Sequence, residues 1–317
     1  MSADGAALAR RLRDGDLSAA PAVLNLLESS APDDREQAAE LSSELAPAGL
    51  GGEAPGHVIG VTGPPGAGKS TMLSALLAGW RARGATVAIL AVDPSSRSSG
   101  GALLGDRARI SFDPGDDGVL IRSTAAGERL GGLARASAAA AHALAAAFDV
   151  VVIETVGVGQ AETDVAEVAD TVLVVVQPGA GDVLQFLKSG IMEVPDVLVV
   201  TKADLGQLAT RTRRDLAAAL RSLGVASTPV LEVSSLPPTQ GVDELIDALE
   251  AHRAGIDVPA RRLRARRARA LKEFVAEHGE RGLRAVGGGA AAQALLSEQD
   301  PGAEVPALIE RLERALG

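Results

Sequence analysis

A glycine-rich segment, GPPGAGKST at residues 63–71, constrains the fold of this chain more than any other feature. It fits the pattern G-x-x-x-x-G-K-[ST], follows the apolar run VIGVT and precedes the helical stretch MLSALLAGWRARG. A loop of this pattern between a strand and a helix points its backbone N–H groups at phosphate oxygens, assisted by the positive helix N-terminus. An ordinary glycine-rich turn is disfavoured because pattern and context agree. We therefore predict a phosphate-binding loop formed by Gly63, Gly66, Ala67, Gly68, Lys69, Ser70 and Thr71, in which the lysine reaches the β- and γ-phosphates and the serine binds magnesium.

Six apolar runs between His57 and about Ala254 alternate with stretches that are compatible with helices. The runs are VIGVT, TVAILAV, DVVVIE, TVLVVV, DVLVVT and TPVLEV. This alternation is typical of a mostly parallel sheet with helices on both faces. We therefore predict an α/β domain over residues 57–255.

The regions that flank this domain are predicted to be helical. Residues 3–46 show helical periodicity with interruptions near 14–15 and 31–32, and PAGLGGEAPG at 47–56 indicates a linker or turn. After Pro259 come a basic helical stretch, a glycine triplet at 287–289 and two short amphipathic stretches. We predict an N-terminal helical extension at 1–50 and a C-terminal helical region at 259–317.

Composition excludes several classes of protein. Aromatic residues make up 2% of the chain and the formal net charge is -10, which disfavours base stacking and a nucleic-acid partner. The chain has no Cys, its four His form no ligand spacing, and no apolar segment is long enough to cross a bilayer. Helical spacing spreads the basic residues of 260–272 around a helix. This favours a solvated helix, which could also pack against a partner subunit, over a nucleic-acid-binding surface. We expect a cytoplasmic protein with neither a nucleic acid nor a membrane as its partner.

Three acidic residues are candidates for a metal site. The strand-like run VVVIE ends at Glu154, and VDPSSRSSGGALLGD carries Asp93 at a strand end and Asp106 farther on. A carboxylate at the end of a buried strand is costly unless it is paired or near a metal, so beside a phosphate-binding loop it belongs to a magnesium shell, directly or through water. The simpler alternatives are a strand end that reaches solvent and, at Asp93, an Asx turn. Gly157 is predicted to supply a backbone N–H near the γ-phosphate.

A second strand end indicates which base is bound. VLVVTKADLG resembles the [N/T]KxD guanine-recognition loop of GTPases, with Thr201 where Asn is usual. Asp204 can accept from guanine N1–H and N2–H, which adenine does not match, and Lys202 can lie along the face of the ring. The segment VSSL, with Ser234, Ser235 and Leu236, sits where a second base-contacting loop is expected, although serine pairs are common in loops.

Five segments together give a specific resemblance. GPPGAGKST, VDPSSRSSGGALLGDR, ETVGVGQAE, QPGAGDVLQFLKSGIMEVPD and TKAD resemble the MeaB/ArgK family of SIMIBI-class P-loop GTPases over roughly residues 57–255. The resemblance implies a G domain between a helical extension and a C-terminal dimerisation arm, hence a homodimer that binds GTP, GDP and Mg²⁺. It also implies that the chain protects and loads an adenosylcobalamin-dependent acyl-CoA mutase, notably methylmalonyl-CoA mutase. By motif matching, the phosphate, magnesium and hydrolysis roles fall to Lys69, Ser70, Asp93, Asp106 and Glu154.

Two further features follow from the resemblance. The segment from Gly179 to Lys188, with Asp182, resembles the loop that couples nucleotide state to the mutase, and its alternative is an ordinary strand-to-helix connection. The water-positioning Gln of small Ras-like GTPases is absent, because Val158 stands in its place; Gln160 is the candidate substitute. Cobalamin is expected in the partner, since no D-x-H-x-x-G motif occurs in this chain.

Three other functions compete with this interpretation. One is a kinase associated with amino-acid transport, which transfers phosphate to a protein instead of to water. Another is a metallochaperone GTPase for nickel enzymes, which the lack of Cys and of a His-rich tract disfavours. The last is a membrane-targeting GTPase of the signal-recognition type, which needs a Met-rich domain, whereas this chain has three Met.

Overall fold

The computed structural model describes residues 4–93, 110–125, 135–155, 165–179 and 195–316. These residues belong to two compact units. One unit is continuous, Gly56–Ile256, and contains the sheet. The other is assembled from two stretches of chain, Met1–Pro55 and Asp257–Gly317, and is helical.

The sheet has seven parallel strands in the order β3-β2-β4-β1-β5-β6-β7. Because all strands are parallel, their starts share an amino edge and their ends share a carboxyl edge. The strands are β1 (His57–Thr62), β2 (Val87–Asp93), β3 (Val119–Ala125), β4 (Val150–Thr155), β5 (Thr171–Val176), β6 (Val197–Val200) and β7 (Val230–Glu232).

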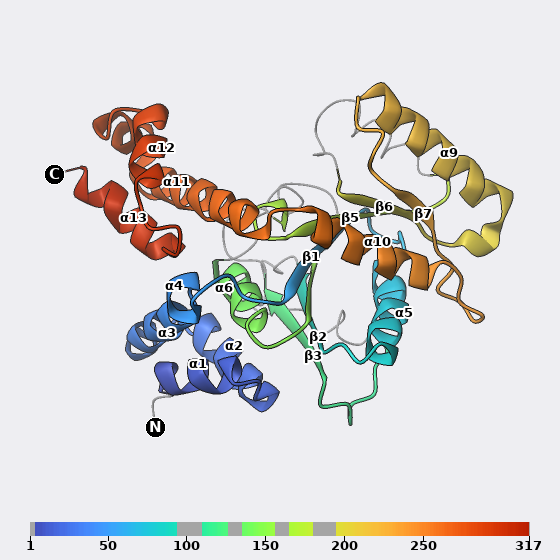
Figure 1. Ribbon diagram of the computed structural model, residues 1–317, viewed down its shortest axis with the longest axis horizontal. Helices are drawn as coiled ribbons and strands as arrows, with labels where there is room; N and C mark the ends of the chain where they lie inside the picture. The colour runs from blue at the N-terminus through green and yellow to red at the C-terminus, as the bar shows by residue number, and fades with distance from the viewer. Residues whose placement is uncertain (1–3, 94–109, 126–134, 156–164, 180–194, 317) are drawn as a thin grey trace, which may run out of the picture. The chain divides into compact units, whose positions relative to one another are not determined.

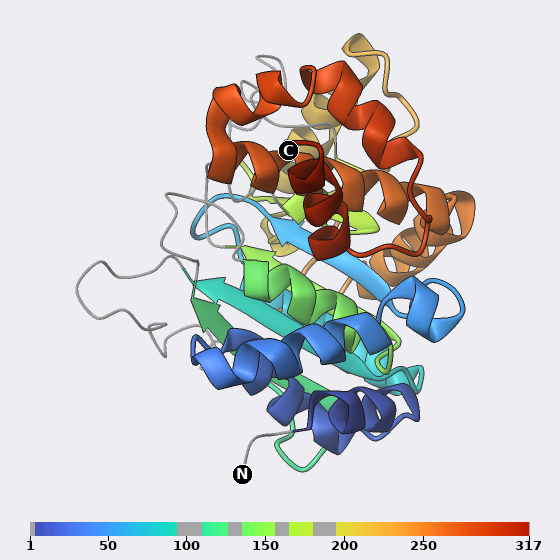
Figure 2. The same cartoon turned by 90° about the vertical axis from the view of Figure 1, so that its left-hand side faces the viewer.

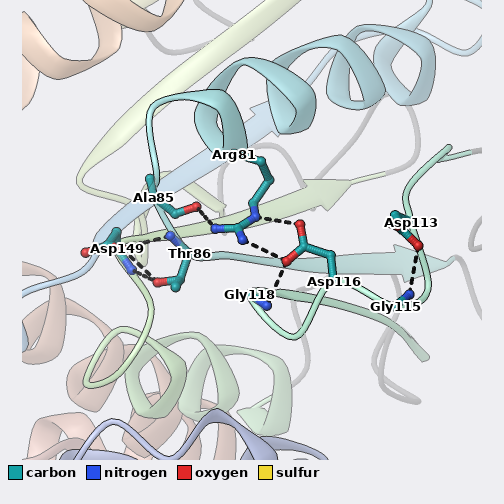
Figure 3. A network of polar contacts seen from close by, with 8 residues as sticks. All are labelled: Arg81, Ala85, Thr86, Asp113, Gly115, Asp116, Gly118 and Asp149. Carbon is teal, nitrogen blue, oxygen red and sulfur yellow. Dashed lines mark hydrogen bonds and ion pairs between the residues drawn. The ribbon is translucent and has the colours of Figure 1, made fainter.

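Helices cover both faces of this sheet, as predicted. They are α5 (Lys69–Ala82), α6 (Arg135–Leu144), α9 (Gln207–Ser222) and α10 (Val242–Gly255), with a short 3₁₀ turn, η3 (Ala203–Leu205). Helices α5 and α6 lie on opposite sides of the strands (Figures 1 and 3). The main core is formed where α5 and α10 bury Leu73, Trp80 and Leu245 against Ile59 and Val175 of the strands.

One strand was not predicted from the sequence. The six apolar runs became β1, β2, β4, β5, β6 and β7, but β3 has the sequence VLIRSTA and forms one end of the sheet. Its last four residues mix Arg122, Ser123 and Thr124 with alanine, because a strand at the end of a sheet has only one neighbour and its side chains need not all be apolar.

The helical unit contains two groups of helices. The first has the expected breaks and consists of α1 (Gly5–Arg13), η1 (Leu17–Ala19), α2 (Ala20–Glu28), α3 (Pro32–Glu44) and the four-residue α4 (Pro47–Leu50), which lies where a linker was expected. The second consists of α11 (Val258–Ala285), α12 (Gly289–Ser297) and α13 (Val305–Arg314). Within each group the helices pack side by side (Figures 1 and 2).

The prediction of a solvated basic helix is partly wrong. Of the basic residues in α11, Arg262, Arg266 and Arg269 are buried. Arg266 forms a two-pronged ion pair with Glu53, at 2.8 and 3.1 Å, and Arg262 donates to the carbonyl of Ala54 at 2.7 Å. Their charges are therefore satisfied inside the helical unit by a segment about 200 residues earlier in the chain, a pairing that helical spacing alone does not reveal.

Polar side chains at the amino edge of the sheet pair with one another. Arg81, in the last turn of α5, donates through Nε and Nη2 to the two carboxylate oxygens of Asp116, each at 2.7 Å, and through Nη1 to Ala85 O at 2.7 Å (Figure 3). The guanidinium lowers the pKa of the Asp116 carboxyl. Beside it, Thr86 Oγ1 and N donate to Asp149 Oδ2, each at 2.8 Å.

A second amino-edge network joins two strands, a helix and the residue that precedes β6. His57 Nε2 lies 2.7 Å from Thr171 Oγ1, which lies 2.8 Å from His252 Nδ1, while His252 Nε2 lies 3.1 Å from Asp196 Oδ1. If His252 is neutral and donates to Asp196, Thr171 donates to His252 and accepts from His57. One hydroxyl thus links the first residue of β1, the first residue of β5 and the last turn of α10.

Candidate functional site

The predicted phosphate-binding loop begins at a close backbone approach. Gly63 has φ 145°, and a Cβ atom there would lie 2.2 Å from Val175 O of the neighbouring strand β5. Any larger residue would therefore push β1 and β5 apart. The loop ends at Gly68, which has φ 88° and caps α5. The N–H groups of the first turn of α5 have no acceptor within the helix, so they are available to phosphate oxygens.

Lys69 is the first residue of α5 and is buried. Its ammonium donates to the carbonyls of Gly63 at 2.7 Å and Pro64 at 3.1 Å, so the side chain curls back over its own loop. A buried ammonium requires partners of this kind. These carbonyls are weaker partners than the oxygens of a polyphosphate, because hydrogen bonds between two charged groups are stronger than those to neutral acceptors.

The structure brings together Ser70 and Glu154, two of the candidate metal ligands. The sheet register places Glu154 on β4 between Val61 of β1 and Ala91 of β2. Ser70 Oγ donates to Glu154 Oε1 at 3.0 Å, and the carboxylate is buried, with a relative exposure of 3%. The alternative of a strand end that reaches solvent is therefore excluded for Glu154.

The chemistry of this donor set fits magnesium. A serine hydroxyl and a carboxylate are the hard oxygen ligands that Mg²⁺ accepts, usually together with several waters and substrate phosphates. Ser70 uses its proton for Glu154, which leaves lone pairs of Oγ available to a cation.

Asp93, another candidate metal ligand, is the last residue of β2, next to β4 in the sheet, and its backbone pairs with Ala125 of β3.

Thr201 braces the loop in place of the usual asparagine. Its Oγ1 lies 2.5 Å from Ala67 O and 3.2 Å from Val176 O, and the residue is buried. A hydroxyl has a single proton, so the shorter contact to the phosphate-binding loop is the main hydrogen bond. The threonine hydroxyl thus supplies a contact between the two loops.

The base side of the site is assembled from β6, η3 and the segment after β7. Asp204 Oδ1 accepts from Ser234 Oγ at 3.1 Å, and Ala203 N donates to Val233 O at 3.1 Å. The TKAD and VSSL segments, the two candidate base-contacting segments, therefore lie in contact. Ser234 is buried, Ser235 is half-buried and Leu236 is 58% exposed.

Lys202 reaches across to the phosphate-binding loop. Its Nζ donates to Gly66 O at 3.1 Å and to Gln177 Oε1 at 2.8 Å. Gln177, which directly follows β5, was not singled out from the sequence. Its position at the carboxyl edge, at the start of QPGAG, is the signal that could have identified it.

Several predicted residues lie outside the described part of the chain. These are Asp106, Gly157, Gln160, Asp182 and Lys188. Of the predicted coupling loop, the structure describes Gly179, whose N–H donates to Thr212 Oγ1 at 3.1 Å. The roles assigned to these residues stay predictions.

Within the described residues, one other cluster has metal-ligand chemistry. Glu277, His278 and Glu313 each offer one ligand atom within 4.8 Å of the others in the helical unit. His278 Nε2 lies 3.2 Å from Glu313 Oε1, within hydrogen-bond distance, so this contact is explained without a metal. None of the helices that the structure describes has the length and apolar character that a membrane crossing requires.

Comparison with known proteins gives consistent similarities. The sequence profile of a family described as "Methylmalonyl Co-A mutase-associated GTPase MeaB" matches residues 20–286. A protein of Pyrococcus abyssi named as a GTPase is 41% identical over 274 residues, 84% of this chain and 82% of that protein. GTPase ArgK of Escherichia coli is 42% identical over 196 residues, 62% of this chain and 58% of that protein. A crystal structure described as LAO/AO transport system kinase has a TM-score of 0.67 at 27% identity, covering 98% of this chain and 96% of that chain.

Proposed function

The chain belongs to the MeaB family of SIMIBI-class P-loop GTPases and hydrolyses GTP, and from that premise we propose that it is a magnesium-dependent switch acting on an adenosylcobalamin-dependent acyl-CoA mutase. The family description names the association with methylmalonyl-CoA mutase. One observation supports this proposal. At the carboxyl edge of the sheet, the candidate phosphate-side residues Lys69, Ser70 and Glu154 lie beside the candidate base-binding segment, and Thr201 and Lys202 of that segment are hydrogen-bonded to the phosphate-binding loop.

On the phosphate side, the chain's own groups bind and orient the nucleotide. The amides of the loop and of the first turn of α5 receive the phosphates, and Lys69 exchanges its two backbone carbonyls for β- and γ-phosphate oxygens. Ser70 and Glu154, together with Asp93 and Asp106, form the proposed magnesium shell. When bound, the ion neutralises charge that develops on the phosphate oxygens.

Hydrolysis requires a water that attacks the γ-phosphate, and this chain has Val158 where small GTPases have Gln. We therefore infer a slow basal rate that a client increases by completing the site. Groups supplied by a partner contribute roughly 10³ to 10⁵-fold in enzymes of this type. Gly157 and Gln160 are the proposed contributors from this chain.

The switch acts through the segment from Gly179 to Lys188, with Asp182 as its second charged member. In this proposal, GTP orders the segments near the γ-phosphate, and hydrolysis releases them. The nucleotide state in turn controls the client: the GTP-bound form protects the mutase and gates loading of the cofactor into it. The C-terminal region, 259–317, is the proposed dimerisation region, and residues 1–50 form the N-terminal extension of the G domain at 57–255.

The decisive experiment measures GTP turnover with and without purified methylmalonyl-CoA mutase, alongside capture of the mutase by the protein loaded with a non-hydrolysable GTP analogue. We expect capture that depends on the analogue and a rate that rises at least about tenfold, well within the range of partner-supplied catalysis. A basal rate that no acyl-CoA mutase changes, with no capture, would refute the client. Lys188→Ala should keep GTP affinity but lose stimulation.

A second candidate function is phosphate transfer to a protein, because a similar solved structure is described as a transport-system kinase. The two functions differ in the acceptor of the γ-phosphate. With labelled GTP, hydrolysis yields free phosphate only, whereas a kinase labels a protein in a host lysate. Label on a protein that persists after denaturing electrophoresis, and is lost in Lys69→Ala, would favour the kinase.

A further inference from the structure

Lys202 is held in an unusual backbone conformation. Among the described residues it is the one non-glycine residue with positive φ, at φ 53° and ψ 43°. A residue with a Cβ atom pays a conformational cost there, so surrounding contacts must hold it. The flanking amides supply some of them: Thr201 N donates to Val176 O at 2.9 Å and Ala203 N donates to Val233 O.

The side chain of Lys202 has two fixed partners. An ammonium has three N–H donors, and here one donates to Gly66 O and one, with the shorter distance, to Gln177 Oε1. Without Gln177, a single carbonyl of a glycine-rich loop would hold a flexible four-carbon side chain. The amide oxygen of Gln177 therefore restricts where the ammonium lies before any nucleotide arrives.

Gln177 also begins a short stem that is held at its other end. Two residues later, Gly179, with φ 82°, donates its N–H to Thr212 Oγ1, which itself donates to Leu208 O at 3.0 Å on α9. Helix α9 starts directly after the TKAD turn. Residues 177–179 are thus held on one side by Lys202 and on the other by the helix that follows it.

We propose that Gln177 is a positioning residue for guanine binding: its side-chain carbonyl holds the Lys202 ammonium at Gly66 O, and this contact ties the base side of the site to the stem at 177–179. The inference rests on the proposed role of Lys202 at the guanine ring. It assigns a function to a residue that lies outside the G-x-x-x-x-G-K-[ST] and TKAD motifs. If Gln177 were only a surface residue, its removal would act independently of Lys202.

A double-mutant cycle on GDP affinity separates these possibilities. Gln177→Met keeps the length of the side chain and removes the acceptor, and we expect about a tenfold weaker Kd, as for other hydrogen bonds to charged groups. In a Lys202→Met background, the same change should cost less than about twofold, because interacting residues are not additive. Gln177→Glu keeps an acceptor oxygen and should restore the affinity to within about threefold of the parent.

The matched control is Thr210→Val, which removes a hydroxyl of α9 that contacts Glu232 and not the stem; it should leave the GDP affinity unchanged. Thermal unfolding of each variant checks the fold, and Gln177→Ala replaces Gln177→Met in the cycle if the latter does not fold. An equal loss of affinity in both backgrounds, or a Glu variant as weak as the Met variant, would overturn the proposal. Equal binding of ATP and GTP by the parent would instead refute guanine recognition itself.

Discussion

The two edges of the sheet use polar side chains in different ways. At the amino edge, side chains bind mainly one another: Arg81 with Asp116, Thr86 with Asp149, and His57 with Thr171 and His252. The carboxyl edge also has side-chain pairs, such as Ser70 with Glu154 and Lys202 with Gln177. Its two lysines, however, bind backbone carbonyls as well: Lys69 donates to Gly63 O and Lys202 to Gly66 O.

This difference indicates which edge is built for binding. A closed set of side-chain partners stabilises the fold but offers little to a ligand, because each strong donor already has a matching acceptor. A cation on a neutral carbonyl can exchange that partner for a phosphate oxygen at little cost. We therefore expect substitutions at the carboxyl edge to change nucleotide chemistry and substitutions at the amino edge to change stability.

The largest expected effect is that of Lys69→Ala. It removes the charge closest to the β- and γ-phosphates, and a loss of kcat/KM for GTP of at least about 10²-fold is expected from comparable electrostatic contributions. The free energy of unfolding without nucleotide should change little, because a buried ammonium is costly to retain. Steady-state phosphate release and urea unfolding check the two parts. A large loss of stability would make Lys69 a structural residue and break the comparison.

The next effect is an exchange of base preference. In Asp204→Asn the side chain presents an amide donor where xanthine carries O2, so the variant should prefer XTP over GTP. In sites that discriminate by hydrogen bonds, loss of a base-specific pair of bonds lowers the preference for the original base by roughly 10²-fold or more. Competitive binding of GTP, XTP and ATP measures this. Retained GTP preference would contradict base recognition by Asp204.

At the amino edge, Thr171→Val should act on stability alone. Removing the hydroxyl takes a hydrogen bond from both His57 and His252, and we expect a loss of about 1 to 3 kcal/mol, as for other buried polar groups that lose a partner. GTP affinity should stay within about twofold, because the change lies at the other end of β5. Urea unfolding and nucleotide titration report the two quantities. Thr228→Val, whose hydroxyl donates only to Pro195 O in the described contacts, is the control.

The smallest expected effect concerns pH. Because Arg81 lowers the pKa of Asp116 in the folded state, the pair stabilises the protein above the ordinary pKa of an aspartate, and this contribution is lost as the pH falls through the lowered value. Asp116→Asn should therefore unfold at a lower temperature than the parent at neutral pH, and the difference should shrink on acidification. Melting curves from pH 7 to pH 3 test the sign. A difference that grows in acid would contradict it.

The sequence predicted the parts of the site that depend on short contiguous segments. GPPGAGKST and TKAD each combine a strand end with a turn of restricted chemistry, which is why Lys69, Ser70 and Asp204 could be named as candidates. In the structure Lys69 lies on its own loop, Ser70 contacts Glu154 and Asp204 contacts Ser234. Glu154 was also named from the sequence, because an apolar run that ends in a carboxylate is costly to bury unless it is paired or near a metal. These inferences needed only local pattern; the structure adds that β4 lies beside β1.

Pairings between distant segments could not be predicted in the same way. The contact between Gln177 and Lys202 requires the register of β5 against β6, and the burial of Arg266 requires Glu53 from the far end of the chain. Likewise, His57 and His252 showed no ligand spacing, yet Thr171 joins them. Each pairing depends on how several elements pack together. The sequence of a single segment does not reveal that packing.

The division of the helical unit has a consequence for how the chain is made. Glu53 and Ala54 are translated early, whereas their partners Arg266 and Arg262 follow only after the whole of residues 56–256. At a typical synthesis rate of about 5 to 20 residues per second, these roughly 200 residues take about 10 to 40 seconds. During that interval the sheet can fold on the ribosome, while the first helices still lack the arginines that later bury Glu53. A nascent chain stalled once residue 256 has left the ribosome should therefore already bind GTP but expose its N-terminal segment to protease.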